Sequence, residues 1–368
     1  MKLKRLIIAC GGTGGHFYPG LSIGREFAAR GGEVLFMLSG KNGAVQCAIV
    51  ESFGLQALEL PFMPPMRQFF SFGIGALKGM VQSLQRLKEF QPDAVLGMGS
   101  YTQLPLLVTA HYLRVPIFIH DGNARIGKSN RFFSKWARYM GSAFPPVNAN
   151  MVRCEVEYTG MPLRRELLAG CQGRTAAVKN LNEKYQVKLL PEAPTVLIFG
   201  GSQGARAINE SVPAAVHNIL NQHPALQVIH LGGKGNLELL RSAYRDYPNS
   251  TLLLESSENM REIYLASDVV ISRSGGSSVA ELRYFKKYAI LIPFPSAAED
   301  HQFDNAAVLA AEGGGEIIRQ EDLTSETLSA RLNDVLAHPE KYRSTASAND
   351  LSINDGVGIL LRKINERL

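Results

Sequence analysis

The chain of 368 residues has little cysteine and no long apolar run. Runs such as 104–109 and 289–294 have the length of a strand or core segment, whereas a membrane-spanning helix needs roughly 18 residues. The apolar run 6–10 is shorter than a signal-peptide core of roughly 7–15 residues, and a glycine-rich segment follows it. The four cysteines include no C-x-x-C pair, so we expect free thiols and no cysteine metal site. These absences predict a cytoplasmic protein.

The sequence also lacks a dense block of one charge. The net charge is +6, from 39 Lys+Arg and 33 Asp+Glu, with no Lys/Arg run and no repeated aromatic-basic pattern. Such a chain is not expected to bind nucleic acid. The mild positive excess suits an anionic partner such as phosphate or acidic lipid, although a slightly basic solvated surface explains it equally well.

Motifs for common cofactors are missing as well. The sequence contains neither the dinucleotide fingerprint, G-x-G-x-x-G with an acidic residue at the next strand end, nor G-x-x-x-x-G-K-[ST]. No Asp-x-Asp pair is present to hold a metal ion on a diphosphate. We therefore expect neither a cofactor nor a metal.

What the sequence does contain is glycine, with 35 residues gathered in clusters. Two segments, 6–29 and 195–220, share one plan, which is an apolar run, a glycine turn and a helix-like stretch. This opening of a doubly wound α/β unit, occurring twice, predicts two Rossmann-like domains in tandem. The polar, proline-containing stretch 144–194 is the predicted linker. Further strands are expected at 33–38, 94–97, 117–120, 227–231, 251–254, 269–272 and 289–293, and an amphipathic helix at 358–368.

The glycine clusters at 11–16 and 200–205 precede helices, and a third lies at 273–278 after a predicted strand. Glycines at a helix start can bind anions, because exposed N–H groups and the helix dipole both favour negative charge. The three loops suggest a diphosphate ligand and a second anionic substrate. The alternative is that the glycines only allow tight strand–helix turns.

Six motifs follow one another along the chain, at 11–21, 97–101, 159–164, 200–206, 272–275 with Glu281, and 300–306. In this order they resemble those of the bacterial peptidoglycan glycosyltransferases of the MurG type, in glycosyltransferase family 28. The resemblance implies an α/β GT-B fold, with two Rossmann-like doubly wound parallel-sheet domains facing a cleft. It implies an acceptor- and membrane-side domain at 1–160, a UDP-sugar-binding domain at 161–349, and a C-terminal helix at about 350–368 that packs back on the first domain.

The resemblance also implies a reaction, which is the inverting, metal-independent transfer of N-acetylglucosamine from UDP-N-acetylglucosamine to the muramyl 4-hydroxyl of lipid I, forming lipid II. The implied partners are UDP-N-acetylglucosamine, lipid I and an anionic membrane surface. The protein is then expected to be peripheral, on the cytoplasmic face of the plasma (inner) membrane. The alternatives are a related GT-B enzyme with another glycolipid acceptor, a UDP-sugar epimerase, and a non-catalytic binding subunit.

On the donor side, the resemblance implies that Glu281 accepts hydrogen bonds from both ribose hydroxyls and that Ser202 helps to hold the diphosphate. From the residues alone, Ser278 and Glu281 are equally a capping box, and Ser202 is an N-cap serine. Gln302 and Asn305 share one helical face and would reach the sugar hydroxyls, although such a pair is more often on the surface. The implied donor set is Thr13, Gly14, Gly15, Asn123, Arg164, Ser202, Ser257, Gly276, Ser277, Ser278, Val279, Ala280, Glu281, Gln302 and Asn305.

Within that set, Arg164 would contact the donor or its phosphates, although a lone arginine is more readily a solvated charge. Ser257 would meet uracil through its backbone, at a position where the family usually has an apolar residue.

The sequence departs from the family pattern at His120-Asp-Gly-Asn123, where His-Glu-Gln-Asn is usual. It departs again at Met161, where the family has Asn, and at the stretch 102–106, which is bulkier than the family's glycine-rich one.

On the acceptor side, the resemblance implies that Thr13, Gly14 and Gly15 hold the lipid diphosphate, with Tyr101 and Asn123 also in the acceptor site. His16 is the implied general base, because a group must take the proton of the attacking hydroxyl and imidazole titrates in the right range. From the residues alone, His16 is equally a cap of the following helix.

An apolar segment with cations at its edges covers residues 62–78. Its composition suits an interfacial patch, in which aromatic rings enter the headgroup layer and cations meet anionic lipid. An ordinary buried loop and helix explains the composition equally well. The predicted membrane patch consists of Arg67, Phe69, Phe70, Phe72, Ile74, Leu77 and Lys78.

Overall fold

The computed structural model describes residues 2–64, 68–201, 204–247, 251–342, 353 and 355–368, without the side chain of Phe69. The chain divides into two compact units. The N-terminal unit comprises Met1–Arg164 and Leu351–Leu368, and the C-terminal unit comprises Arg165–Asp350. The second unit is therefore an insertion between two parts of the first.

The N-terminal unit is built on a seven-stranded parallel sheet within the described residues, with the strand order β3-β2-β1-β4-β5-β6-β7. Its strands are β1 (Arg5–Ala9), β2 (Glu33–Leu38), β3 (Gln56–Glu59), β4 (Ala94–Gly97), β5 (Ile117–Asp121), β6 (Tyr139–Ser142) and β7 (Glu155–Tyr158). Its helices are α1 (Gly14–Ala29), α2 (Gly43–Ser52), α3 (Phe69–Phe90), η1 (Tyr101–Gln103), α4 (Leu104–Tyr112), α5 (Lys128–Phe133), η2 (Ala149–Met151) and α15 (Gly356–Glu366).

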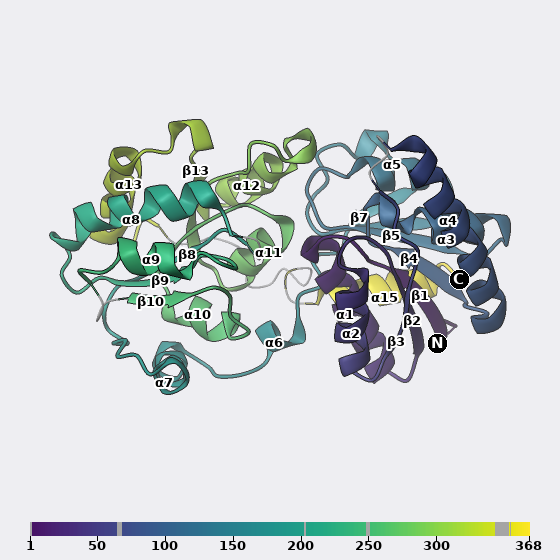
Figure 1. Cartoon of the computed structure of the whole chain (residues 1–368), viewed down its shortest axis with the longest axis horizontal. Helices are drawn as coiled ribbons and strands as arrows, with labels where there is room; N and C mark the ends of the chain where they lie inside the picture. The colour runs from purple at the N-terminus through teal and green to yellow at the C-terminus, as the bar shows by residue number, and fades with distance from the viewer. Residues whose placement is uncertain (1, 65–67, 202–203, 248–250, 343–352, 354) are drawn as a thin grey trace. The chain divides into compact units, whose positions relative to one another are not determined.

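Helices cover both faces of this sheet, which explains why its central strands are apolar throughout. Helices α1, α2 and α15 share one hydrophobic cluster with the strands, and α3, α4 and α5 share a second. Figure 1 shows α15, in yellow, beside the purple elements of this unit. Helix α15 contributes Leu360, Leu361 and Ile364 to the first cluster, and Asp355 caps it by accepting a 3.0 Å hydrogen bond from Gly358 N.

The C-terminal unit repeats this plan with six parallel strands within the described residues, in the order β10-β9-β8-β11-β12-β13. Helices α8, α9 and α13 pack on one face, and α7 packs on α10. The strands are β8 (Thr195–Phe199), β9 (Gln227–Leu231), β10 (Thr251–Leu254), β11 (Val269–Ser272), β12 (Tyr288–Leu291) and β13 (Gly315–Ile317). The helices are α6 (Arg165–Leu168), α7 (Arg174–Tyr185), α8 (Arg206–Leu220), α9 (Leu237–Ala243), α10 (Met260–Ala266), α11 (Gly276–Tyr284), η4 (Ala298–Asp300), α12 (His301–Ala311), η5 (Gln320–Asp322) and α13 (Ser325–Ala337).

The doubly wound α/β architecture predicted from the sequence is confirmed in both units. The strand order reverses between β1 and β4 and again between β8 and β11, so each sheet has a switch point there. Ligands of open α/β sheets bind at the carboxyl ends of strands beside such points. The loops after these four strands are the three predicted glycine clusters and the segment that begins at Gly97.

The apolar run 104–109 belongs to helix α4, so of the two alternatives that its length allowed, a strand or a core segment, the second holds. One expectation about local structure is wrong. The stretch 144–194 is not only a linker, since it contains strand β7 and helix α7. Strand β7 lies at the edge of its sheet and carries exposed Glu155, so it lacks the continuous apolar pattern of a central strand.

Candidate active site

The first glycine loop connects β1 to α1, and its backbone carbonyls are bonded to side chains. Thr102 Oγ1 donates to Gly11 O at 3.1 Å, and Gln46 Nε2 donates to Gly12 O at 3.1 Å. Gly12 has a φ of 105°, which favours glycine. Thr13 is the N-cap of the 16-residue helix α1, and Gly14 and Gly15 begin its first turn. The predicted anion-binding residues therefore lie at the positive end of a long helix.

His16 lies in the first turn of α1 and reaches the loop after β4. Its Nδ1 is 3.0 Å from Met98 O, and a Cβ at Gly99 would approach the ring to 3.0 Å. Because a carbonyl oxygen can only accept, Nδ1 carries the proton and the neutral ring has its lone pair on Nε2. This hydrogen bond joins His16 to another loop and not to the start of its own helix, unlike the predicted helix cap.

Tyr101 and Asn123 lie in the loops after β4 and β5, strands that are neighbours in the sheet. The Tyr101 hydroxyl donates to Met63 O at 3.2 Å. The backbone N–H of Asn123 donates to Asp121 Oδ1 at 3.0 Å, which fixes the start of this loop. The sheet order therefore brings the loops of His16, Tyr101 and Asn123 to one edge.

Arg164 is the last residue of the N-terminal unit, and its guanidinium carbon lies 5.4 Å from the ring centroid of Tyr18 on α1. This cation–π contact places it beside the start of α1, unlike the solvated charge that a lone arginine predicts.

In the C-terminal unit, the second glycine loop packs against the loop after β9, and buried Asn209 holds that loop by a hydrogen bond. A Cβ at Gly204 would lie 2.3 Å from Gly232 O, so the two backbones touch. Asn209 Nδ2 donates to Gly232 O at 2.8 Å, and His230 Nε2 is 3.2 Å from Asn209 Oδ1. Burial lowers the pKa of His230 to about 3, so the ring is neutral. The predicted Ser202 lies outside the described residues.

The third glycine cluster leads into α11, whose N-cap is Gly275. Ser278 is therefore a residue of the first turn and not a cap, so the capping-box interpretation of Ser278 and Glu281 is wrong. Glu281 is 8% exposed, and its Oε2 accepts a 2.9 Å hydrogen bond from the Tyr264 hydroxyl. The first turns of α11 contain the predicted donor residues Gly276, Ser277, Ser278, Val279 and Ala280.

Asn305 and Gln302 on α12 both hold loop backbone in this structure. Asn305 is fully buried and its Nδ2 donates to Ser274 O at 3.1 Å, so it is not a surface residue. Gln302 Oε1 accepts from Phe294 N at 3.0 Å. The buried Ser274 hydroxyl has no hydrogen-bond partner within the described part of the chain. An orphaned hydroxyl beside a helix N-terminus is a ready donor for a bound anion.

Ser257 lies in the loop before α10, and its side chain is engaged within the protein. Its hydroxyl is 2.8 Å from the Tyr185 hydroxyl and accepts from Asn259 N at 3.0 Å. The side chain therefore fixes the loop, and the contact of the Ser257 backbone with uracil stays a prediction.

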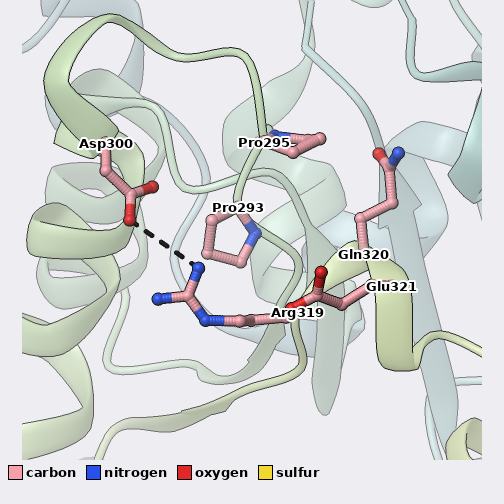
Figure 2. Close-up of a pocket in the computed structure, with 6 residues that line it drawn as sticks. All are labelled: Pro293, Pro295, Asp300, Arg319, Gln320 and Glu321. Carbon is pink, nitrogen blue, oxygen red and sulfur yellow. Dashed lines mark ion pairs between the residues drawn. The ribbon is translucent and has the colours of Figure 1, made fainter.

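Sequence reasoning missed a hollow of about 200 Å³ beside the start of α12 (Figure 2). Arg319 crosses it toward Asp300 at 3.7 Å. Arg273, from the third glycine cluster, donates to Gln320 Oε1 at 2.6 Å and to Pro293 O at 3.1 Å. The sequence signal that could have indicated this region was the position of Arg273 within the motif at 272–275. The hollow is lined by Pro293, Pro295, Asp300, Arg319, Gln320 and Glu321.

Helix α3 presents a stripe of exposed apolar side chains, so the buried-helix interpretation of this segment is wrong here. Phe70 is 85% exposed, and Ile74 and Leu77 follow at helical spacing, with Val81 and Leu84 extending the stripe. Lys78 is also exposed. Phe72 differs, because its ring lies 6.3 Å from that of Tyr101. Arg67 lies outside the described residues.

Within the described residues, no three His, Cys, Asp or Glu side chains are grouped so that they could bind a metal ion. No helix in the same residues is long and apolar enough to span a bilayer.

Comparison with known families matches both units. Residues 6–142 match the glycosyltransferase family 28 N-terminal domain, and residues 195–357 match the family 28 C-terminal domain. Two curated relatives carry the name UDP-N-acetylglucosamine–N-acetylmuramyl-(pentapeptide) pyrophosphoryl-undecaprenol N-acetylglucosamine transferase. That of Citrifermentans bemidjiense is 32% identical over 340 residues, covering 91% of each chain. That of Syntrophotalea carbinolica is 31% identical over 371 residues, covering 97% of each.

Solved structures share the fold across both units. MurG of Acinetobacter baumannii has a TM-score of 0.75 at 24% identity and covers 99% of each chain. UDP-GlcNAc 2-epimerase of Neisseria meningitidis, bound to UDP-GlcNAc, has a TM-score of 0.71 at 13% identity, covering 99% of this chain and 100% of its own. Because transferases and epimerases share this fold, the fold by itself does not choose between the two reactions.

Proposed function

The chain belongs to glycosyltransferase family 28, and from that premise we propose that it transfers N-acetylglucosamine from UDP-N-acetylglucosamine to the muramyl 4-hydroxyl of lipid I, forming lipid II. The curated relatives, which span nearly the whole chain, carry this activity in their name. The observation that carries the proposal is the His16 imidazole, whose Nδ1 is engaged by Met98 O so that Nε2 is left as the basic nitrogen.

The proposed chemistry is a single inverting displacement. The 4-hydroxyl oxygen attacks the anomeric carbon, the new C–O bond forms as the bond to the UDP diphosphate breaks, and His16 Nε2 accepts the hydroxyl proton. UDP leaves as the diphosphate anion. General-base catalysis of this kind contributes typically 10²–10⁴-fold to the rate.

The donor is assigned to residues of the C-terminal unit. The diphosphate is assigned to the N-terminal amides of α11 and to the Ser274 hydroxyl in the loop before this helix, which has no hydrogen-bond partner within the described residues. These donors could stabilise the negative charge of the diphosphate without a metal ion. Glu281, held by Tyr264, accepts from the ribose hydroxyls. Gln302 and Asn305 are assigned to the sugar, and Ser257 to uracil through its backbone.

The acceptor is assigned to the N-terminal unit, where Thr13, Gly14 and Gly15 would hold the lipid diphosphate and Tyr101 and Asn123 would border the muramyl sugar. The exposed stripe of α3 would lie in the headgroup layer of an anionic membrane, with Lys78 meeting acidic lipid. The protein would then act as a peripheral enzyme on the cytoplasmic face.

A defined assay tests this proposal. Purified protein is given UDP-N-acetylglucosamine and a short-chain lipid I analogue, and both disaccharide product and UDP are measured. We expect product and UDP in equal amounts, and no UDP without acceptor. UDP release with diacylglycerol but not with the lipid I analogue would instead establish another glycolipid acceptor. Turnover without any acceptor would establish an epimerase, and binding without turnover would establish a non-catalytic subunit.

A further inference from the structure

One peptide group lies between the His16 imidazole and the side-chain amide of Gln103. Its carbonyl, Met98 O, accepts from His16 Nδ1 at 3.0 Å. Its N–H, at Gly99, donates to Gln103 Oε1 at 3.0 Å. The two side chains therefore bond opposite ends of a single planar unit, whose resonance links the charge on its oxygen to the charge on its nitrogen.

The hydrogen bonds continue from Gln103 to a carboxylate. Gln103 Nε2 donates to Asn130 Oδ1 at 2.8 Å, and Asn130 Nδ2 donates to Asp121 Oδ2 at 2.9 Å. The side chains of Gln103, Asn130 and Asp121 are at most 3% exposed. Water therefore does not screen these bonds, and each is electrostatically stronger than it would be in solvent.

The chemistry of the partners fixes the direction of every bond in this series. Gly99 N–H can only donate, so the oxygen of Gln103 faces it and the amino group faces Asn130. Asn130 Nδ2 faces two acceptors, His120 O at 3.2 Å and the Asp121 carboxylate. All donors thus point from His16 toward Asp121, and the series ends on a negative charge.

Two glycines make the series possible. A Cβ at Gly97 would lie 2.3 Å from Gln103 Oε1, and a Cβ at Gly99 would lie 3.0 Å from the His16 ring. Ser129 forms a side branch, accepting from Gln103 Nε2 at 3.0 Å and donating to Ser100 O at 2.8 Å. The loops after β1, β4 and β5 are thereby joined into one buried polar network.

We propose that Gln103, Asn130 and Asp121 form an amide relay that holds His16 in its Nδ1–H tautomer and strengthens Nε2 as a base through the peptide between Met98 and Gly99. The carboxylate polarises the amides in turn, which makes Met98 O a stronger acceptor and stabilises the imidazolium formed when the substrate proton arrives. The three residues are positioning residues, since none needs to touch the substrate. The inference rests on the proposed function, in which His16 is the base.

The test compares two substitutions at one position. Gln103→Met keeps the shape but removes all three side-chain hydrogen bonds, to Gly99, Asn130 and Ser129, whereas Gln103→Glu keeps an oxygen that accepts from Gly99 N–H. Imidazole ¹⁵N and ¹H resonances are recorded on histidine-labelled protein without substrate, with the His16 signal identified by its loss in His16→Gln. In the native protein we expect a protonated Nδ1. In Gln103→Met we expect a mixture of tautomers and a kcat about ten-fold lower at unchanged donor KM, as for one lost buried hydrogen bond.

Gln103→Glu should keep the native tautomer, because an oxygen still accepts from Gly99 N–H, but its second oxygen cannot donate to Asn130 Oδ1. Ser129→Ala, which removes only the side branch, should leave the imidazole spectrum as in the native protein. If Gln103→Met fails to fold, Asp121→Asn decides, because removal of the charge should shift the Nδ1 proton resonance upfield and lower kcat several-fold. A native spectrum with Nε2 protonated overturns the relay. A fall in kcat with unmoved imidazole signals in Gln103→Met does the same. Since the spectra need no substrate, this failure is distinguishable from a failure of the lipid I assay.

Discussion

The two units share the order of their first six strands, and in both of them side chains donate to loop carbonyls near the switch points, but the donors differ. In the N-terminal unit the donors include an imidazole, that of His16 at Met98, beside the Thr102 hydroxyl at Gly11. In the C-terminal unit the corresponding donors among the described residues are the buried amides of Asn209 at Gly232 and Asn305 at Ser274. On the proposed function, the same topology would carry a proton-accepting site in one unit and an anion- and hydroxyl-binding site in the other. Substitutions should accordingly lower kcat in the first and donor affinity in the second.

The largest expected effect is on the N-terminal side. His16→Ala removes the proposed base, so kcat should fall roughly 10²–10⁴-fold in the lipid I assay while the dissociation constant for UDP-N-acetylglucosamine stays unchanged. Calorimetric titration measures the latter. The matched control is His111→Ala, an exposed histidine of the same unit that stacks on Trp136 and should leave both quantities as they are. If kcat of His16→Ala were the same as that of the native enzyme, the assignment of the general base to the N-terminal unit would be contradicted.

On the C-terminal side, Glu281→Ala should weaken donor binding about 10- to 150-fold, because the variant lacks the buried carboxylate that would accept charge-assisted hydrogen bonds from the ribose hydroxyls. The value of kcat at saturating donor should change much less. Glu210→Ala serves as control, since Glu210 is half exposed and forms an ion pair with Arg206 on α8. Unchanged donor affinity in Glu281→Ala would contradict the ribose assignment.

The smallest expected effect is on membrane binding by the N-terminal unit, which can be measured separately from its turnover. Leu77→Asp should lower binding to vesicles that contain anionic lipid about five-fold, because it places a charge in the apolar stripe of α3. Val45→Asp on α2 is the matched control, as Val45 and Leu77 are each 64% exposed. Sedimentation with vesicles measures binding, and turnover in detergent should be equal for both variants. Equal vesicle binding by the two would locate the membrane contact elsewhere.

The sequence predicted nine of the thirteen described strands, because buried parallel strands are often continuous apolar runs. Strands β2, β4 and β9 have the predicted bounds. Strands β3, β6, β7 and β13 were missed, and in edge strand β7 the alternating glutamates Glu155 and Glu157 obscure the pattern. For α4, an apolar run of that length did not distinguish helix from strand.

The candidate site was predictable only where a motif lies on one stretch of chain. The glycine clusters and His16 are of this kind. The role of Gln103 is not, because it depends on contacts with Gly99 and with Asn130, 27 positions further along the chain. In the sequence, Gln103 only marked a stretch bulkier than the family pattern. Whether Glu281 belongs to a capping box depended on where α11 begins, and a helix start is uncertain by a residue or two in any sequence pattern.

Helix α15 has a consequence for how the chain is made. Its residues Leu360, Leu361 and Ile364 complete a core whose other members are translated before residue 140. The N-terminal unit therefore cannot close that core until the whole C-terminal unit has left the ribosome. A nascent chain exposes this apolar gap throughout synthesis of the inserted unit, so the unit that begins first is the last to finish folding.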